Sequence, residues 1–292
     1  MKLITTMVLL GLSAICLSQY KMEDHFKIYD TRIKQVVTLQ RIIEECNHTD
    51  ILFFGEEHND SACHYLEAEI VRALYQKFTD KLALSLEMFE TDNQVALNDY
   101  LAGFILEDRF AKDVRLWTNY KDYRPMIEFA KQNNIPVIAA NPPRRYVSMV
   151  SRRGMKSLDS LSKVSKQFLP PLPYDTLEGS YREKFLETMK GSPGGDNPRI
   201  YHSQSLWDAG MSNSIYQYWK KNKHKKIFHC VGRFHCDERL GTLAQLQKRK
   251  PTLKILNISC FSDASFHDPD WEKFNKLADF IILTDPGLKK TY

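Results

Sequence analysis

The sequence predicts an α/β fold: a mainly parallel sheet with flanking helices and an inserted helical cap. Short apolar runs rich in Ile, Val, Leu and Phe recur along the chain, as expected for strands buried on both faces. Segments with helical periodicity separate these runs, which favours right-handed crossovers between parallel strands. Residues 151–199 contain no strand pattern and predict the cap.

Six apolar runs are expected to form the strands of this sheet. They are residues 51–54, 82–86, 136–140, 227–231, 254–258 and 280–283. The expected helices outside the cap are residues 64–78, 123–132, 204–221 and 238–249, and a further helix is expected at 181–189 within it. In the helix at 64–78, the apolar stripe includes Leu66, Ile70 and Leu74. This pattern assigns Glu67 to the polar side, and His64 is expected at the surface.

The composition is that of a folded globular protein. The chain has 292 residues, of which 43% are hydrophobic and 26% are charged, and its net charge is +5. These values exclude a disordered chain, a collagen-like fibre and a small disulfide-dense protein. The modest charge shows no basic stripe, so we expect no nucleic-acid binding.

The first 18 residues have the pattern of a secretory signal peptide. Lys2 precedes the apolar run 3–17, and the small residue Ser18 follows it. We therefore expect export to a periplasm or to the outside, with residues 19–292 forming the mature domain. A lipoprotein is disfavoured because Ile15, before Cys16, is larger than a lipobox normally has. No other segment is long and apolar enough to cross a membrane.

The five remaining cysteines do not form a zinc or redox motif. An odd number of cysteines in an exported chain requires a free thiol or an intermolecular bond, and no CxxC pair is present. We expect them to be small buried side chains, with or without one disulfide among them.

Polar residues follow four of the predicted strands, where ligands bind in open α/β sheets. They are Glu56 with His58, then Glu87, Asn141 and His235. A carboxylate and an imidazole two residues apart suit either a metal such as Zn or Mn or a general acid–base pair. Each residue alone is equally compatible with a helix cap or a structural histidine, but four such strand ends together predict a functional site.

Further candidate site residues, with weaker sequence signals, lie on the predicted helices. Tyr123 and Arg124 open one helix, and Arg124 would either hold a carboxylate or cap the site. Asp208 lies among small and apolar residues of another helix, near His202. A buried acid there needs a partner, and a pocket histidine would serve. GxSxG, P-loop and HExxH motifs are absent from the sequence, which removes the usual evidence for serine hydrolases, NTPases and zincins.

Several segments resemble one known family. They are Gly55-Glu56-Glu57-His58, Leu86-Glu87-Met88-Phe89, Tyr123-Arg124-Pro125, Leu206-Trp207-Asp208-Ala209-Gly210-Met211 and Val231-Gly232-Arg233-Phe234-His235. In this order they resemble the ChaN-like family of haem-binding uptake proteins, which belongs to a wider group with TIKI/TraB proteases and erythromycin esterases. The chain departs from the family pattern at Arg233-Phe234 and at residues 236–241, where a glycine-rich ending is usual.

The resemblance implies haem binding outside the cytoplasm, in iron acquisition, with haem between the α/β core and the cap or sandwiched in a homodimer. Haem needs an axial ligand, commonly His or Tyr, an apolar slot and cations for its propionates. The residues selected for this role are Tyr123, Arg124, Asn141, Arg144, Tyr174, Tyr181, His202 and Asp208. The axial ligand stays open, because the cap tyrosines could instead serve aromatic packing.

The alternative is a metal-dependent peptidase or esterase. Its catalytic residues would be Glu56, His58, Glu87 and His235, with Glu56, His58 and His235 holding or activating the metal-bound water. Whether the protein is an enzyme therefore stays open at this point. A third reading is a non-catalytic partner protein that binds neither haem nor metal.

Overall fold

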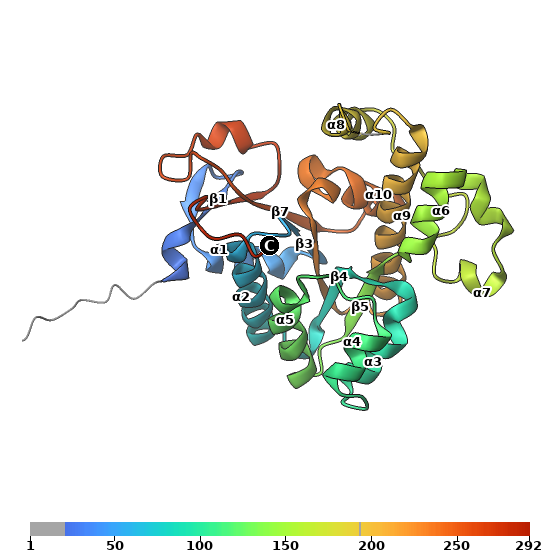
Figure 1. Cartoon of the computed structure of the whole chain (residues 1–292). Coiled ribbons are helices and arrows are strands. Elements are labelled where there is room, and N and C mark those ends of the chain that lie inside the picture. Colours follow the sequence, from blue (N-terminus) through green and yellow to red (C-terminus); the bar gives the residue numbers. More distant parts are fainter. Residues whose placement is uncertain (1–20, 193) are drawn as a thin grey trace, which may run out of the picture.

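The computed structural model of the chain describes residues 21–192 and 194–292. The predicted signal peptide lies outside the described residues. Figure 1 shows a sheet with helices on both sides and a group of helices that projects from one end.

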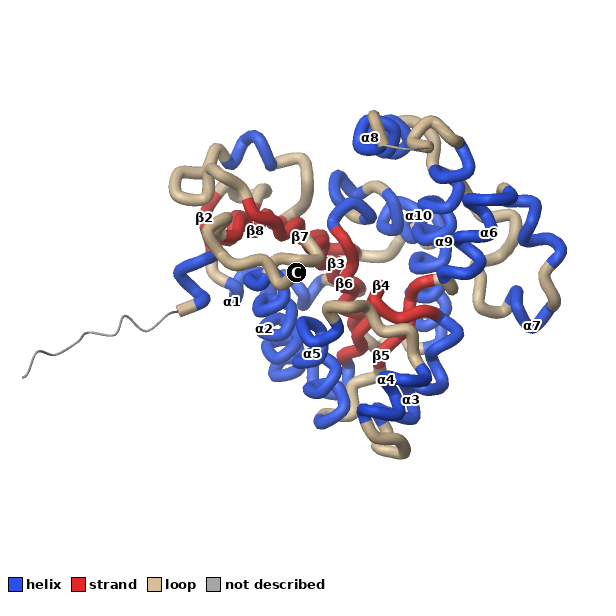
Figure 2. Tube along the Cα trace, in the orientation of Figure 1, coloured by secondary structure: helices blue, strands red, loops and turns tan. Residues whose placement is uncertain are grey.

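One eight-stranded sheet runs through the molecule (Figure 2). The strands are β1 (Phe26–Asp30), β2 (Gln35–Val37), β3 (Ile51–Glu56), β4 (Leu82–Glu90), β5 (Val137–Asn141), β6 (Lys226–Gly232), β7 (Ile255–Ser262) and β8 (Phe280–Thr284). Their spatial order is β2-β1-β8-β7-β3-β6-β4-β5. All pairs from β8 to β5 are parallel, whereas β1 pairs antiparallel with both β8 and β2.

All six predicted strands are present, and the α/β class is confirmed. The edge strand β2 and its neighbour β1 were not predicted. They are short, and β1 includes Lys27 and Asp30, so its apolar content is too low to show a buried strand. β3, in contrast, is buried throughout.

The helices are α1 (Leu39–Glu45), α2 (Ser61–Phe78), α3 (Gln94–Leu101), α4 (Glu107–Asp113), α5 (Tyr120–Gln132), α6 (Arg144–Arg153), α7 (Lys163–Lys166), α8 (Ser180–Met189), α9 (Pro198–Lys221) and α10 (Gly241–Arg249). They cover both faces of the sheet, and alternate residues of β3 show the two layers. Phe54 packs in a core with Leu66 of α2 and Met126 of α5. Phe53 packs in a second core with Met211 of α9 and Leu243 of α10.

The helical projection lies between β5 and β6. The described residues of this segment, 142–192 and 194–225, contain no strand, and α6, α7, α8 and α9 lie there. The expected cap at 151–199 falls within this segment. Two apolar clusters hold it together. One includes Tyr174 and Leu206, and the other includes Tyr181 and Phe185. α9 is shared, because its other residues pack on the sheet.

β6 follows β3 and β4 in the sequence but lies between them in the sheet. Glu56 is in register with Gly232, which brings the residues after β3 and β6 side by side at one edge. This is the edge where open α/β sheets bind ligands.

Two further expectations concern the described residues. All five of their cysteines are buried and none forms a disulfide, although the Cys63 thiol donates to the Cys260 sulfur at 2.7 Å. No described helix is long and apolar enough to cross a membrane.

Candidate functional site

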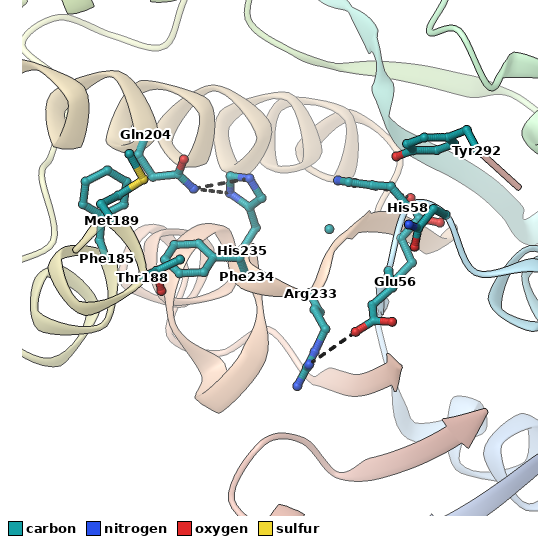
Figure 3. Close-up of a pocket in the computed structure, with 13 residues that line it drawn as sticks. Glu56, His58, Phe185, Thr188, Met189, Gln204, Arg233, Phe234, His235 and Tyr292 are labelled. Atoms are coloured by element: carbon teal, nitrogen blue, oxygen red, sulfur yellow. Dashed lines mark hydrogen bonds and ion pairs between the residues drawn. The ribbon is translucent and has the colours of Figure 1, made fainter. Parts of the chain in front are cut away.

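A cavity of about 480 Å³ opens beyond the carboxyl ends of β3 and β6 (Figure 3). Its size is in the range of small-molecule sites. The lining residues are Glu56, Glu57, His58, Asn59, Phe185, Thr188, Met189, Gln204, Gly232, Arg233, Phe234, His235 and Tyr292. The core supplies acids and imidazoles, whereas α8 supplies apolar side chains.

Two glycines allow the cavity walls to approach one another. A Cβ on Gly55 would lie 2.6 Å from the Cys236 sulfur and 3.0 Å from the Cα of Arg233. A Cβ on Gly232 would lie 2.8 Å from Nε2 of His58. The strand ends at β3 and β6 therefore need glycine so that His58 can lie against the backbone of β6.

On the core side, Glu56 orients His58. Nδ1 of His58 lies 2.7 Å from Oε1 of Glu56, and the Tyr123 hydroxyl donates to the same oxygen at 2.6 Å. Burial disfavours the imidazolium, but the hydrogen bond to Glu56 and the charges of Glu87 and Glu56 raise the pKa of His58 to about 9. Nε2 of His58 remains on the cavity side, and about one third of the side chain is exposed.

On the cap side, Asp208 orients His235 in the same way. Nδ1 of His235 lies 2.7 Å from Oδ1 of Asp208. Tyr181 donates to Oδ2 at 2.6 Å and Thr242 donates to Oδ1 at 2.9 Å. Burial opposes the charge of His235, but Asp208 and Glu87 outweigh it and raise its pKa. From the sequence we expected a buried Asp208 to need a partner, for which a pocket histidine would serve, and His235 occupies this position.

Glu87 lies between the two oriented histidines. Its Oε2 accepts the backbone N–H of Gly232 at 2.7 Å, and its Oε1 lies 3.8 Å from Nε2 of His235. Figure 3 shows His58 and His235 projecting towards the same cavity from opposite sides. The site therefore presents two imidazoles, each held by a carboxylate at Nδ1.

A third histidine, His64, lies beneath the cavity with Glu56 and Glu67. Ligand atoms of these three buried residues lie within 4.8 Å of one another. Burial and the nearby charge of Glu56 raise the pKa of Glu67 well above its usual value. Burial also opposes the charge of Glu56, but the hydrogen bond from His58, the neighbouring Glu67 carboxyl group and the charges of His58 and His64 lower its pKa to about 2.

The expectations for His64 and Glu67 were wrong. His64 is 6% exposed and Glu67 is fully buried, although we expected a surface residue and a residue of the polar side. The physical reason is that the first turns of α2 are buried on more than one side, against the sheet and against α5. A spacing of four residues from Cys63 places Glu67 on a buried face, and this was the available sequence signal.

The remaining predicted residues are dispersed. Tyr123 and Tyr181 are buried, and their hydroxyls are directed to Glu56 and Asp208 rather than to the cavity. Tyr174 donates to the His202 carbonyl within the cap. Arg124 pairs with Glu107 outside the cavity.

Asn141, at the end of β5, is buried but does not line the cavity, and its side-chain oxygen has no hydrogen-bond partner. His202 also lies outside the cavity lining, and burial followed by the charge of Arg182 lowers its pKa. Arg144 lines two adjoining cavities, of about 470 and 560 Å³. The predicted metal set of Glu56, His58 and His235 does not bring its ligand atoms within 4.8 Å of one another, and it stays a prediction.

Sequence reasoning missed the apolar wall of the cavity. Phe185 and Met189 come from α8, and Phe234 follows β6. The helical pattern at 181–189 was recognised, but it does not show which side of the helix would face the core.

Comparisons with known proteins agree with this fold. The chain is similar to ChaN of Campylobacter jejuni, solved for its cofacial heme binding, with a TM-score of 0.68, 16% identity, and coverage of 89% of this chain and 97% of that one. A Bacillus cereus protein is similar with a TM-score of 0.51 and 12% identity, covering 91% of this chain and 98% of that one. At these sequence identities, the two structural similarities show a shared fold.

Sequence comparison gives a more distant relative and a family. Protein RETICULATA-RELATED 5, chloroplastic, of Arabidopsis thaliana is 26% identical over 139 residues, which cover 45% of this chain and only 19% of that protein. The family profile described as haem-binding uptake, Tiki superfamily, ChaN matches residues 42–246. This match includes β3 to β6, the first part of α10 and both oriented histidines, and the chain therefore belongs to the ChaN family of haem-binding uptake proteins.

Proposed function

We propose that this protein binds haem in the cavity between the α/β core and α8, with His58 as the axial ligand. The observation that carries the proposal is the orientation of His58. Its Nδ1 is held by Glu56, which leaves Nε2 for the iron, and its side chain is partly exposed at the cavity. A carboxylate at the second ring nitrogen is the usual arrangement for a metal-binding histidine.

The lining residues fit a haem group. Phe185, Met189 and Phe234 form an apolar wall opposite the imidazoles. Phe185 and Met189 also line the neighbouring cavity of about 560 Å³, so a large flat ligand could extend beneath α8. Exposed Arg144 reaches the two adjoining cavities and forms no ion pair with a described residue, which leaves it available to a propionate.

In this proposal the bound haem supplies the iron centre, and the protein binds and orients it. Glu56 fixes the tautomer of His58, while Tyr123 and Asn119 position Glu56 and the His58 carbonyl. α8 excludes water from one side of the cavity. His235 is the second imidazole that faces this space.

A haem titration followed by absorbance tests the proposal. The wild-type protein should give a saturable Soret shift at micromolar haem, and His58→Ala should weaken binding by about tenfold or more. His202→Ala is the matched control, because His202 lies in the cap but outside the cavity lining. No saturable binding by the wild type would contradict haem binding, whereas loss in His235→Ala but not in His58→Ala would contradict the ligand assignment.

A metal-dependent peptidase or esterase is the second candidate. The observation in its favour is that Glu87 contacts the Gly232 N–H and approaches Nε2 of His235, whose Nδ1 is held by Asp208. This arrangement can move a proton at Nε2 of His235. Hydrolysis of ester and peptide substrates with added Mn²⁺ or Zn²⁺, lost in Glu87→Gln, would support it. Equal activity of wild type and Glu87→Gln would count against it.

We also propose export, with residues 1–18 removed, and a homodimer in the haem-bound state. Support for export comes from the sequence pattern of the first 18 residues. The mass of protein recovered from a secreting host should correspond to a chain that starts at Gln19, and an uncleaved chain in the cytoplasm would contradict export.

The proposed homodimer is tested by light scattering, which measures the oligomeric state with and without haem. A monomer in both conditions would contradict the dimer.

A further inference from the structure

The cluster of Glu56, His64 and Glu67 contains more carboxylate than its neighbours neutralise. Oε2 of Glu56, Oε1 of Glu67 and Oδ2 of nearby Asp122 are buried and have no hydrogen-bond partner. Within the described part of the chain, no lysine or arginine forms an ion pair with any of these three acids. Buried carboxylates are costly unless a proton, hydrogen-bond donors or a cation compensate them.

The distances suit a small ion. Nδ1 of His64 lies 3.3 Å from Oε2 of Glu56 and 3.2 Å from Oε2 of Glu67. Ligands placed about 2.1 Å from one ion at tetrahedral angles are separated by about 3.4 Å. The two distances to His64 therefore match this ligand spacing, and the carboxylate oxygens of Glu56 and Glu67 lie within 4.8 Å of each other.

The surroundings of His64 also match those of a metal-binding histidine. Its Nε2 lies 3.1 Å from the His58 carbonyl, which receives a second hydrogen bond from Asn119. Donation from Nε2–H to a carbonyl would leave the lone pair of Nδ1 directed at the carboxylates. Tyr123 packs edge-on against the imidazole and restricts its rotation.

We propose that Glu56, His64 and Glu67 form a binding site for a divalent transition-metal ion beneath the floor of the cavity. Carboxylates with one imidazole suit Mn²⁺ or Zn²⁺. This site differs from the predicted set of Glu56, His58 and His235, and it does not depend on haem binding. Glu56 belongs to both arrangements, since one oxygen orients His58 and the other would bind the ion.

A metal ion at this site would also affect His58 in the cavity. Because Glu56 would be shared, a bound ion would stabilise its ionised form and fix the position of His58. The opposing explanation of the same geometry is a proton shared between Glu56 and Glu67. The two explanations differ in what Glu67→Gln does, because an amide imitates a neutral acid but is a poor ligand.

The experiment uses the protein without haem, freed of metal by a chelator and titrated with Mn²⁺ and, separately, Zn²⁺ by calorimetry. Loss of the free-ion EPR signal follows Mn²⁺ directly. We expect one ion per chain, a rise in Tm with excess ion, and about 100-fold weaker binding by Glu67→Gln. Glu69→Gln is the matched control, because Glu69 is on the same helix but pairs with Arg72.

Three outcomes would overturn the proposal. The first is the absence of saturable binding of either ion by the wild type, and the second is equal binding by Glu67→Gln and Glu69→Gln. Zn²⁺ binding that survives Glu67→Gln and disappears when the thiols are alkylated would assign the ion to cysteines, and this also contradicts the proposal. If Glu67→Gln does not fold, His64→Gln removes the nitrogen ligand instead and should weaken Mn²⁺ binding to a similar extent.

Discussion

Two acid–histidine pairs lie at the same cavity, Glu56–His58 from the core and Asp208–His235 from α9 and the turn after β6. The distance from Nδ1 to the carboxylate is 2.7 Å in both pairs, and a tyrosine donates to each acid at 2.6 Å. They differ in what else surrounds the acid. Thr242 adds a further donor to Asp208, whereas Glu56 has Glu67 as its neighbour and one oxygen without a hydrogen-bond partner.

The difference shows that the groups around a buried carboxylate determine whether its charge is compensated within the protein. Neutral hydroxyl donors together with an imidazole stabilise the buried charge of Asp208 without an added ion. A second carboxylate beside Glu56 repels it and requires a proton or a cation. The charge of Asp208 in the cap-side pair is thus compensated by protein groups alone. The core-side pair belongs to a larger cluster of acids, for which we propose a divalent metal ion.

The largest expected effect concerns the cap-side pair. Asp208→Ala removes the acceptor of three buried hydrogen bonds and leaves His235 without its partner. We expect unfolding free energy to fall by about 3–5 kcal/mol, as when one member of a buried pair is removed. Chemical denaturation of the metal-free protein measures the loss. A change below about 1 kcal/mol would show that the hydrogen-bonded acid contributes little to stability.

His229 provides a comparison in which a buried histidine has no carboxylate partner. His229 is fully buried, and burial, with a smaller contribution from the charge of His235, lowers its pKa to about 3 despite its hydrogen bond to Ser85. The unfolded chain takes up this proton below about pH 6.5, whereas the folded chain does not. Stability contributed by neutral His229 is therefore present above pH 6.5 and is lost as pH falls towards 3.

His229→Gln should flatten this pH dependence. Unfolding free energies at several pH values between 6.5 and 4 measure the slope. Across this interval we expect the unfolding free energy of the variant to fall by up to about 3 kcal/mol less than that of the wild type. A variant slope equal to that of the wild type would mean that His229 does not titrate in this way.

The smallest expected effect compares the two tyrosines. Tyr181→Phe removes one donor from Asp208, and we expect a loss of about 1.5–3 kcal/mol, as for a hydrogen bond to a charged group. Tyr123→Phe removes the equivalent donor from Glu56. In excess Mn²⁺ its cost should be smaller, since the ion stabilises the same carboxylate. Tm measurements of both variants with and without Mn²⁺ test this, and an unchanged cost of Tyr123→Phe would contradict compensation by the ion.

Much of the site was predictable because its signals are local. Glu56, His58, Glu87 and His235 all come directly after or near the ends of the predicted apolar runs, although Glu56 ends β3 and Glu87 lies within β4. The carboxyl ends of parallel strands meet at one edge. The need of Asp208 for a partner was predictable too, because an acid among small and apolar helical residues has to be compensated. The order of the strands was not predictable in this way, and neither was the presence of β1 and β2.

The amino-acid sequence by itself determined the α/β class, the six buried strands and the polar residues at their ends, since apolar periodicity depends on neighbours along the chain. Only the tertiary structure decided that β6 lies between β3 and β4, which brings His235 to face His58. It also decided that His64 and Glu67 are buried beside Glu56. Burial of a helix side depends on the elements packed against it, and α5, which supplies Tyr123 and Asp122 to this cluster, is more than 40 residues away in sequence from α2.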